Sequence, residues 1–121
     1  MLLSDICSIL DAKVLTNDAD SFDKIDIHMA CGCDLMSDVL AFVKDQALLL
    51  TGLLNQQVIR TAEMMDIVAV CFVRGKLPAQ EVIDLAEKRG IALIATEHPL
   101  YNACGMLYDK GLRGREHGQA L

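Results

Sequence analysis

Two thiols two residues apart form the sharpest chemical feature of this sequence. Cys31 and Cys33 flank Gly32 and precede Asp34, close to a predicted helix N-terminus, which would lower the pKa of a thiol. Thiolates bind soft metal ions and switch redox state, and Cys104 is a third candidate ligand. A single C-x-C is a much weaker signal than a doubled C-x-x-C, and the sequence offers no fourth ligand. Because cysteine is often buried as a small apolar residue, we favour an inert thiol pair over a metal or redox site.

A second candidate site, for an anion, lies where three apolar runs end in small or polar residues. Backbone N–H groups at helix starts, with cationic side chains beside them, can hold an anion. The candidate ligand-binding residues are Thr51, Gly52, Asn55, Gln56, Arg74, Gly75, Lys76, Thr96, Glu97 and His98. Short crossover connections need glycines and helix caps whether or not they bind anything, so each break taken alone also fits a purely structural role.

Acid–base catalysis by His98 with Glu97 is the reading that we rank last. His28 occupies an alternating position typical of a structural histidine, and His117 lies near the C-terminus. No G-x-x-x-x-G-K-[ST], G-x-G-x-x-G or G-x-S-x-G motif is present, so neither a P-loop kinase, a dinucleotide-binding enzyme nor a serine hydrolase is indicated. We therefore expect a protein that is not an enzyme and that carries no cofactor.

The elements that must position these residues follow from hydrophobic periodicity. The apolar run over 67–73, a helix over 78–89 and a second run over 92–95 predict a strand, a crossover helix and a parallel strand. Further helices are predicted over residues 4–10, 34–43, 55–65 and 98–111, and further strands over residues 13–16, 25–30 and 47–50, with a polar loop over 17–23. We expect Ser4 and Asp5 to cap the first helix and Asp34 to cap the second. Together these elements predict a three-layer α/β/α domain with a mainly parallel, mixed sheet, and ligand sites at the strands' C-terminal ends.

Composition narrows the class of protein. The chain has 121 residues, which suits one domain, and eleven Lys and Arg against seventeen Asp and Glu give a net charge of −6. This acidity excludes nucleic acid as a partner, and apolar runs of about seven residues are far shorter than the ~18 to 20 that cross a membrane. Five cysteines, an odd number, and an N-terminus without a signal-like basic region favour a cytoplasmic protein without disulfides. Cys7 and Cys71 are expected to be core residues.

Residues 48–107 resemble the DRTGG domain, a regulatory module fused to phosphate acetyltransferases and CBS-containing pyrophosphatases and related in fold to the N-terminal domain of HPr kinase. The resemblance rests on the segments 48–52, 58–62, 74–76, 81–86 and 90–96, with 34–38 upstream. Two positions depart from the family pattern. Leu53 and Leu54 replace its Asp-Arg pair, and residues 74–76 read Arg-Gly-Lys in place of Thr-Gly-Gly.

The polar, glycine-bearing composition from residue 112 onward predicts a flexible tail over 112–121. The resemblance implies a single DRTGG-like domain over residues 1–111, with its core over 25–110. It also implies a homodimer. The expected function is that of a non-enzymatic regulatory module acting in trans, which senses a small anionic or nucleotide-like ligand or binds a protein partner. The alternatives are a metal- or redox-responsive protein using Cys31 and Cys33, and a small enzyme using His98 and Glu97.

Overall fold

Five strands form one mixed sheet in the computed structural model, which describes residues 1–42 and 44–115. The strands are β1 (Lys13–Val14), β2 (Met29–Gly32), β3 (Ala47–Thr51), β4 (Ile67–Phe72) and β5 (Ala92–Ala95). Their order across the sheet is β1-β5-β4-β3-β2. Only β1 pairs antiparallel, with β5, and the remaining neighbours are parallel. The predicted mixed, mainly parallel sheet is confirmed.

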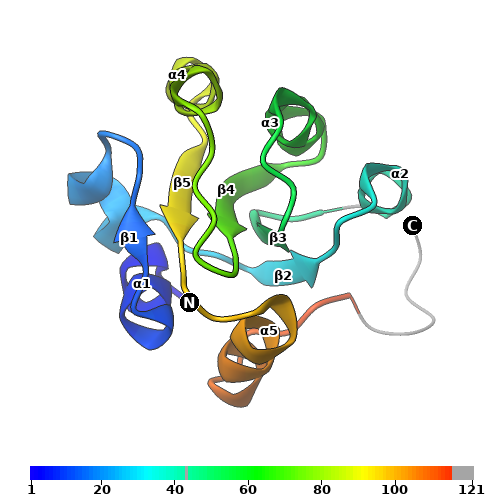
Figure 1. Cartoon of the computed structure of the whole chain (residues 1–121). Helices are drawn as coiled ribbons and strands as arrows, with labels where there is room; N and C mark the ends of the chain where they lie inside the picture. The colour runs from blue at the N-terminus through cyan, green and yellow to red at the C-terminus, as the bar shows by residue number, and fades with distance from the viewer. Residues whose placement is uncertain (43, 116–121) are drawn as a thin grey trace.

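Helices cover both faces of the sheet (Figure 1). One face carries α2 (Met36–Val39), α3 (Gln56–Met64) and α4 (Gln80–Arg89), which connect successive parallel strands. The other face carries α1 (Leu3–Leu10) and α5 (Leu100–Asp109). This arrangement confirms the three-layer α/β/α prediction. Within the described residues no helix is long and apolar enough to cross a membrane.

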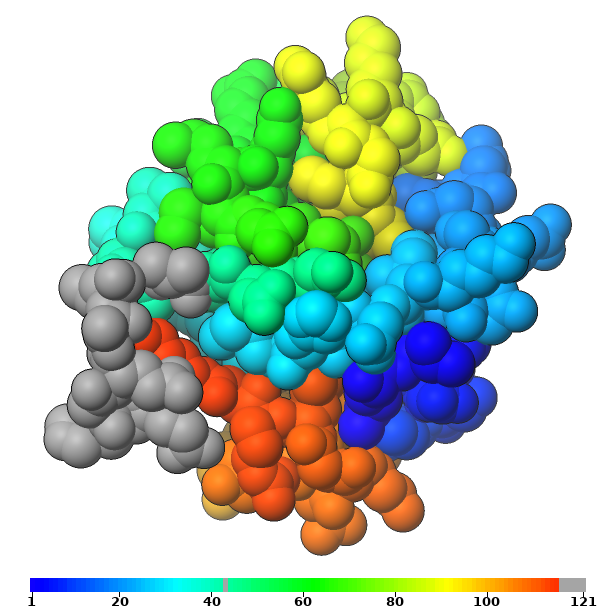
Figure 2. All heavy atoms as spheres, turned by 180° about the vertical axis from the view of Figure 1, so that it is seen from behind, coloured from blue at the N-terminus to red at the C-terminus, as the bar shows by residue number. Residues whose placement is uncertain are grey.

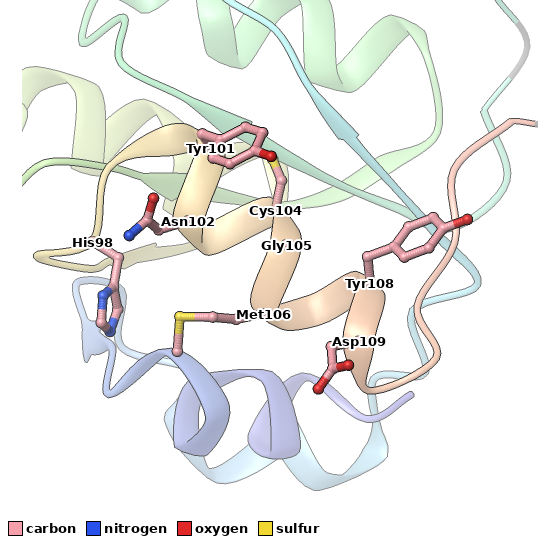
Figure 3. Close-up of a pocket in the computed structure, with 8 residues that line it drawn as sticks. All are labelled: His98, Tyr101, Asn102, Cys104, Gly105, Met106, Tyr108 and Asp109. Carbon is pink, nitrogen blue, oxygen red and sulfur yellow. The ribbon is translucent and has the colours of Figure 1, made fainter.

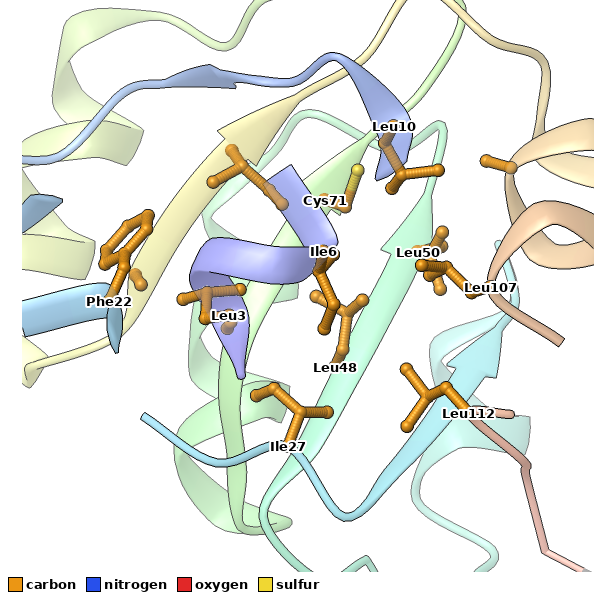
Figure 4. Packing of buried hydrophobic residues seen from close by; sticks show 14 of the residues in the cluster. Leu3, Ile6, Leu10, Phe22, Ile27, Leu48, Leu50, Cys71, Leu107 and Leu112 are labelled. Atoms are coloured by element: carbon orange, nitrogen blue, oxygen red, sulfur yellow. The ribbon is translucent and has the colours of Figure 1, made fainter. Parts of the chain in front are cut away.

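The central strands are apolar throughout because both of their faces are covered. Every residue of β3 is buried, and its side chains alternate between the two layers. Leu48 and Leu50 pack beneath α1 and α5 (Figure 4), whereas Leu49 packs against α3 and α4. Cys71 is fully buried on the α1 and α5 side, and Cys7 packs against the same cluster. Both cysteines are small core residues, as predicted.

Strand β2, at one edge of the sheet, lies further along the chain than predicted. Alternation indicated a strand over 25–30, but the ladder begins at Met29, which pairs with the first residue of β3, and runs through Cys31 to Gly32. The preceding residues are extended for another reason. They bond the N-terminal segment, with the Leu3 N–H donating to the Ile25 carbonyl and the Ile27 N–H donating to the Met1 carbonyl. Period-two alternation reports extended backbone, not the strand with which it pairs.

Helix boundaries differ from the predictions in the same half of the chain. The expected loop over 17–23 contains a 3-10 helix (Ala19–Lys24), which buries Phe22. The helix expected over 34–43 is a single turn, α2, and Val43 lies outside the described residues. Neither α1 nor α2 has a side-chain N-cap, so the predicted capping by Ser4, Asp5 and Asp34 is wrong.

Residues 112 and 113, which follow the expected domain end at residue 111, contact the rest of the domain. Leu112 is buried in the core, and the Arg113 carbonyl accepts a hydrogen bond from the Ala30 N–H on the free edge of β2. Figure 2 shows this orange-red segment lying beneath the cyan chain around β2. The apolar side chain of Leu112 and the unpaired edge of β2 explain why residues 112 and 113 pack against the domain. Residues 116–121 of that tail lie outside the described residues.

Candidate functional site

The carboxyl ends of three neighbouring strands bring the predicted site residues together. The Val73 N–H donates to the Thr51 carbonyl at 3.2 Å, and the Arg74 N–H donates to the His98 carbonyl at 2.9 Å. These bonds continue the pairing of β3, β4 and β5 beyond their last ladder residues, so the three junctions are contiguous. We call the surface formed by Asp34, residues 51–56, residues 74–76 and residues 96–98 the strand-end edge.

Arg74 presents the principal cation of this edge. Its backbone is in the left-handed region (φ 62°), which is uncommon for a residue with a side chain. The guanidinium reaches back over the β3–α3 loop. Its Nη2 atom lies so close to Gly52 that a methyl group on this glycine would be only 3.1 Å away. Among the described residues the exposed side chains of Arg74 and Lys76 form neither a hydrogen bond nor an ion pair.

Asp34 belongs to the same edge, although it was predicted only as a helix cap. Its Oδ1 accepts hydrogen bonds from the Gly52 N–H at 2.7 Å and from the Thr51 hydroxyl at 2.9 Å. Because Gly32 pairs with Leu50, the residues two positions further along each chain segment, Asp34 and Gly52, meet across the edge. The Asp34 carboxylate therefore accepts a hydrogen bond from the Gly52 N–H, a group that the sequence analysis assigned to binding an anion. Only the register of β2 against β3 could have revealed this contact.

Two predicted ligand residues, Thr51 and Thr96, are buried and bonded inside the domain. Besides donating to Asp34, Thr51 Oγ1 accepts from the Leu53 N–H at 3.2 Å. Thr96 Oγ1 donates to the Leu10 carbonyl at 2.7 Å and so joins the strand-end edge to α1. Neither side chain is accessible to a ligand, since their exposed fractions are 0% and 2%.

Asn55 and Gln56 start α3 at the exposed rim of the edge. Asn55 is the N-cap residue by backbone position but makes no side-chain cap hydrogen bond. The Gln56 Oε1 accepts from Arg60 Nη2 at 3.2 Å, one turn along the helix. Asn55 is thus free to contact a ligand, whereas Gln56 already has a partner.

Glu97 and His98 follow β5 but point to different places. Gly75 has φ 70°, a conformation that favours glycine, and the Glu97 carboxylate lies over its α-carbon, where an added methyl group would meet it. The His98 side chain instead lies beside the exposed surface of α5 (Figure 3). Within the described residues no hydrogen bond joins Glu97 to the imidazole. The structure therefore places the Glu97 carboxylate over Gly75 and the His98 imidazole beside α5.

The three candidate metal-binding thiols lie on opposite faces of the sheet. Cys31 and Cys33 pack on the α3 and α4 side, and Cys104 packs on the α1 and α5 side, directly over Gly32. No cluster of three His, Cys, Asp or Glu among the described residues is placed to hold a metal ion. Burial raises the pKa of the Cys31 and Cys104 thiols, and for Cys31 this outweighs the opposing charge of Lys44. The lowered thiol pKa predicted here is therefore wrong for Cys31.

Comparisons with known proteins place this architecture in a family. The sequence model of the DRTGG domain matches residues 5–109, a longer stretch than the 48–107 identified from the sequence. One similar solved structure contains the CBS and DRTGG domains of the regulatory region of Clostridium perfringens pyrophosphatase, complexed with its activator, diadenosine tetraphosphate. The TM-score is 0.69 at 16% identity, over 88% of this chain and 45% of that chain. This chain therefore spans less than half of its structural neighbour. A search of curated proteins found no match.

Proposed function

Because this chain belongs to the DRTGG domain family, as the match over residues 5–109 shows, we propose that it is a regulatory module that binds a small anionic ligand. Its structural neighbour is a regulatory region of an enzyme, in complex with a nucleotide activator. The binding surface that we propose is the strand-end edge. The module acts without catalysing a reaction and passes the binding signal to a partner protein or domain.

The exposed guanidinium of Arg74 above Gly52 is the observation that carries this proposal. Arginine binds phosphate and carboxylate groups through two parallel hydrogen bonds, and this one has no partner among the described residues. Lys76 supplies a second cation two residues away. In a chain of net charge −6, this local pair is the feature of the edge that attracts an anion.

The neighbouring carboxylates narrow the class of ligand. Asp34 and Glu97 lie on the same edge, and Asp34 already accepts the Gly52 N–H. Two carboxylates repel a bare polyanion but accept hydrogen bonds from hydroxyl groups. A phosphate group carried on a sugar or nucleoside satisfies both kinds of contact, with the phosphate on Arg74 and Lys76 and the hydroxyls on the carboxylates.

Thermal-shift and calorimetric titrations of the full chain test the proposal. The probes are inorganic phosphate, AMP, ATP and diadenosine tetraphosphate. A ligand present at a hundred times its Kd stabilises the folded state by about 2.7 kcal/mol, which a thermal shift resolves. We expect a nucleotide to raise the melting temperature more than inorganic phosphate does.

The variant Arg74→Gly separates binding from folding. Glycine adopts φ 62° without strain, so the variant keeps the fold while losing the cation, and the shift should disappear. Arg89→Ala is the matched control, since Arg89 is exposed and lies at the end of α4, next to the start of β5. The proposal fails if no probe binds at millimolar concentration, or if Arg74→Gly binds as tightly as the wild type.

Self-association completes the proposal. The family resemblance implies a homodimer, and a regulatory module that pairs with itself can couple two ligand sites.

A further inference from the structure

Each of the loops that follow β2, β3 and β4 carries leucine beside the polar residues of the strand-end edge. These leucines, which we call the leucine rim, are Leu35, Leu53, Leu54 and Leu77. Leu35 is 58% exposed and Leu77 is 52% exposed, whereas the other two are partly buried against the α3 and α4 side of the sheet. A single exposed leucine is ordinary on a protein surface. Leucine in all three loops instead gives this edge an apolar surface, which is typical of a binding site.

Gly52 brings the cationic and the apolar parts of this edge together. The guanidinium of Arg74 lies over this glycine, and Leu53 is the next residue along the chain. The Leu53 N–H donates a hydrogen bond to the Thr51 hydroxyl at 3.2 Å, which fixes the backbone where the apolar part of the loop begins. A ligand whose anionic group binds Arg74 therefore has leucine beside that contact.

The edge offers three kinds of contact, and together they narrow the ligand further. Arg74 and Lys76 supply positive charge, the carboxylates of Asp34 and Glu97 supply hydrogen-bond acceptors, and the leucine rim supplies aliphatic surface. An acyl chain would place hydrocarbon against the carboxylates and desolvate them without a partner. A nucleobase has two apolar faces and a rim of N–H donors, so it can lie flat on leucine while its rim faces a carboxylate.

We propose that the leucine rim holds the base of a nucleoside phosphate, so that the site selects nucleotides over sugar phosphates. The inference rests on the proposed function, because it requires the phosphate of the ligand to bind Arg74. It goes further by assigning the residues that recognise the rest of the ligand. Leu53 and Leu54 stand where the family pattern has Asp and Arg, so this selectivity belongs to the present chain and does not follow from the family.

Isothermal titration calorimetry of the full chain with AMP and with ribose 5-phosphate separates the base from the phosphate. Both probes carry a phosphate monoester on a ribose, and only AMP carries a base. We expect AMP to bind at least about ten-fold more tightly, which is the discrimination that burial of a small apolar group supplies. Inorganic phosphate is the third probe, and it reports the contact with the cations alone.

Leu53→Ser and Leu77→Ser remove two parts of the rim, and urea unfolding of each variant checks that it is folded. Leu77 is more than half exposed, so its substitution leaves the core intact. In both variants the Kd for AMP should rise about five-fold, while the Kd for ribose 5-phosphate stays the same. Arg74→Gly should weaken both probes. Met64→Ser is the matched control, because Met64 is 72% exposed and lies about 12 Å along α3 from its first residue at the edge.

The possible outcomes separate this inference from the proposed function. If AMP and ribose 5-phosphate bind equally well, the anion site stands and the assignment of the leucine rim is overturned. The assignment is also overturned if both leucine variants keep the preference for AMP, or if Met64→Ser loses it to the same extent. If none of the three probes binds at millimolar concentration, the proposed function and this inference fail together.

Discussion

Gly32 is the position where one added methyl group gives the sharpest test of the packing. A Cβ built on Gly32 would lie 2.5 Å from Cys104 Sγ, and ordinary contact begins near 3.4 Å, so Gly32→Ala forces a shift of almost 1 Å. Cys104 is on α5, where few rotamers are open to it. Overpacking of this kind costs about 1–3 kcal/mol, and the smaller entropy of the unfolded alanine chain returns about 0.4–1 kcal/mol. We expect a net destabilisation of about 1–2 kcal/mol.

Urea denaturation followed by far-UV circular dichroism under reducing conditions measures this loss. With an m-value of about 1.5 kcal/mol/M, the midpoint should fall by about 1 M. Gly105→Ala is the matched control, because the same methyl group enters open space within a helix. There the change should stabilise the protein by about 0.5–1 kcal/mol.

A double-mutant cycle then tests the named contact. Cys104→Ala removes Sγ and costs less than about 1 kcal/mol, since the side chain is only half-buried. In the double variant the new methyl group has room, so its free energy of unfolding should exceed the additive value by about 1–2 kcal/mol. The reasoning is refuted if Gly32→Ala is as stable as the wild type, or if the two changes are additive.

Three further predictions concern stability and thiol reactivity. The Met1 amine donates a hydrogen bond to Asp26 at 2.9 Å and lowers the pKa of that carboxyl. The contribution of this pair to the free energy of unfolding is therefore present at neutral pH and is lost as the pH falls through the lowered pKa. In Asp26→Asn, the urea midpoint should depend less on pH below about pH 4 than it does in the wild type. Burial raises the pKa of Cys71 to about 12, so peptide mass spectrometry after iodoacetamide treatment at pH 8 should find Cys71 unlabelled until urea unfolds the chain, while half-exposed Cys33 reacts first. Leu112→Ala should cost about 2–3 kcal/mol in urea denaturation, because Leu112 is 5% exposed, whereas no loss would mean that the domain ends at residue 111.

The unit from β4 to β5 was predicted almost to the residue because its signals are local. Val70 and Cys71 lie in an unbroken apolar run, and Gly90 closes α4 in the left-handed conformation (φ 70°) expected of a helix end. The strand before Cys31 was misplaced because its bounds depend on pairing. Ile25 and Ile27 bond the N-terminal segment, and the parallel ladder starts only where β3 starts.

The sequence predicted that the candidate site residues meet at one edge of the sheet, but it did not predict their hydrogen bonds or their burial. Parallel strands place their carboxyl ends on one edge, so the meeting of Gly52 and Arg74 follows from topology. The role of Asp34 depends on the register of β2 against β3, and the burial of Thr51 and Thr96 depends on α1 and on the loop around them. Residue types along the chain carry no signal for these contacts.

The sequence by itself determined the layer architecture and the edge at which polar residues gather, because hydrophobic period and turn chemistry act over a few residues. The family followed from the resemblance of several segments to the DRTGG domain. Only the tertiary structure decided which of those residues face solvent. It turned Asp34 from a helix cap into the partner of Gly52, and it separated Cys104 from Cys31 by a sheet. It also left Gly105 open between two exposed tyrosines. Each of these outcomes depends on contacts between residues distant in sequence, which local patterns do not specify.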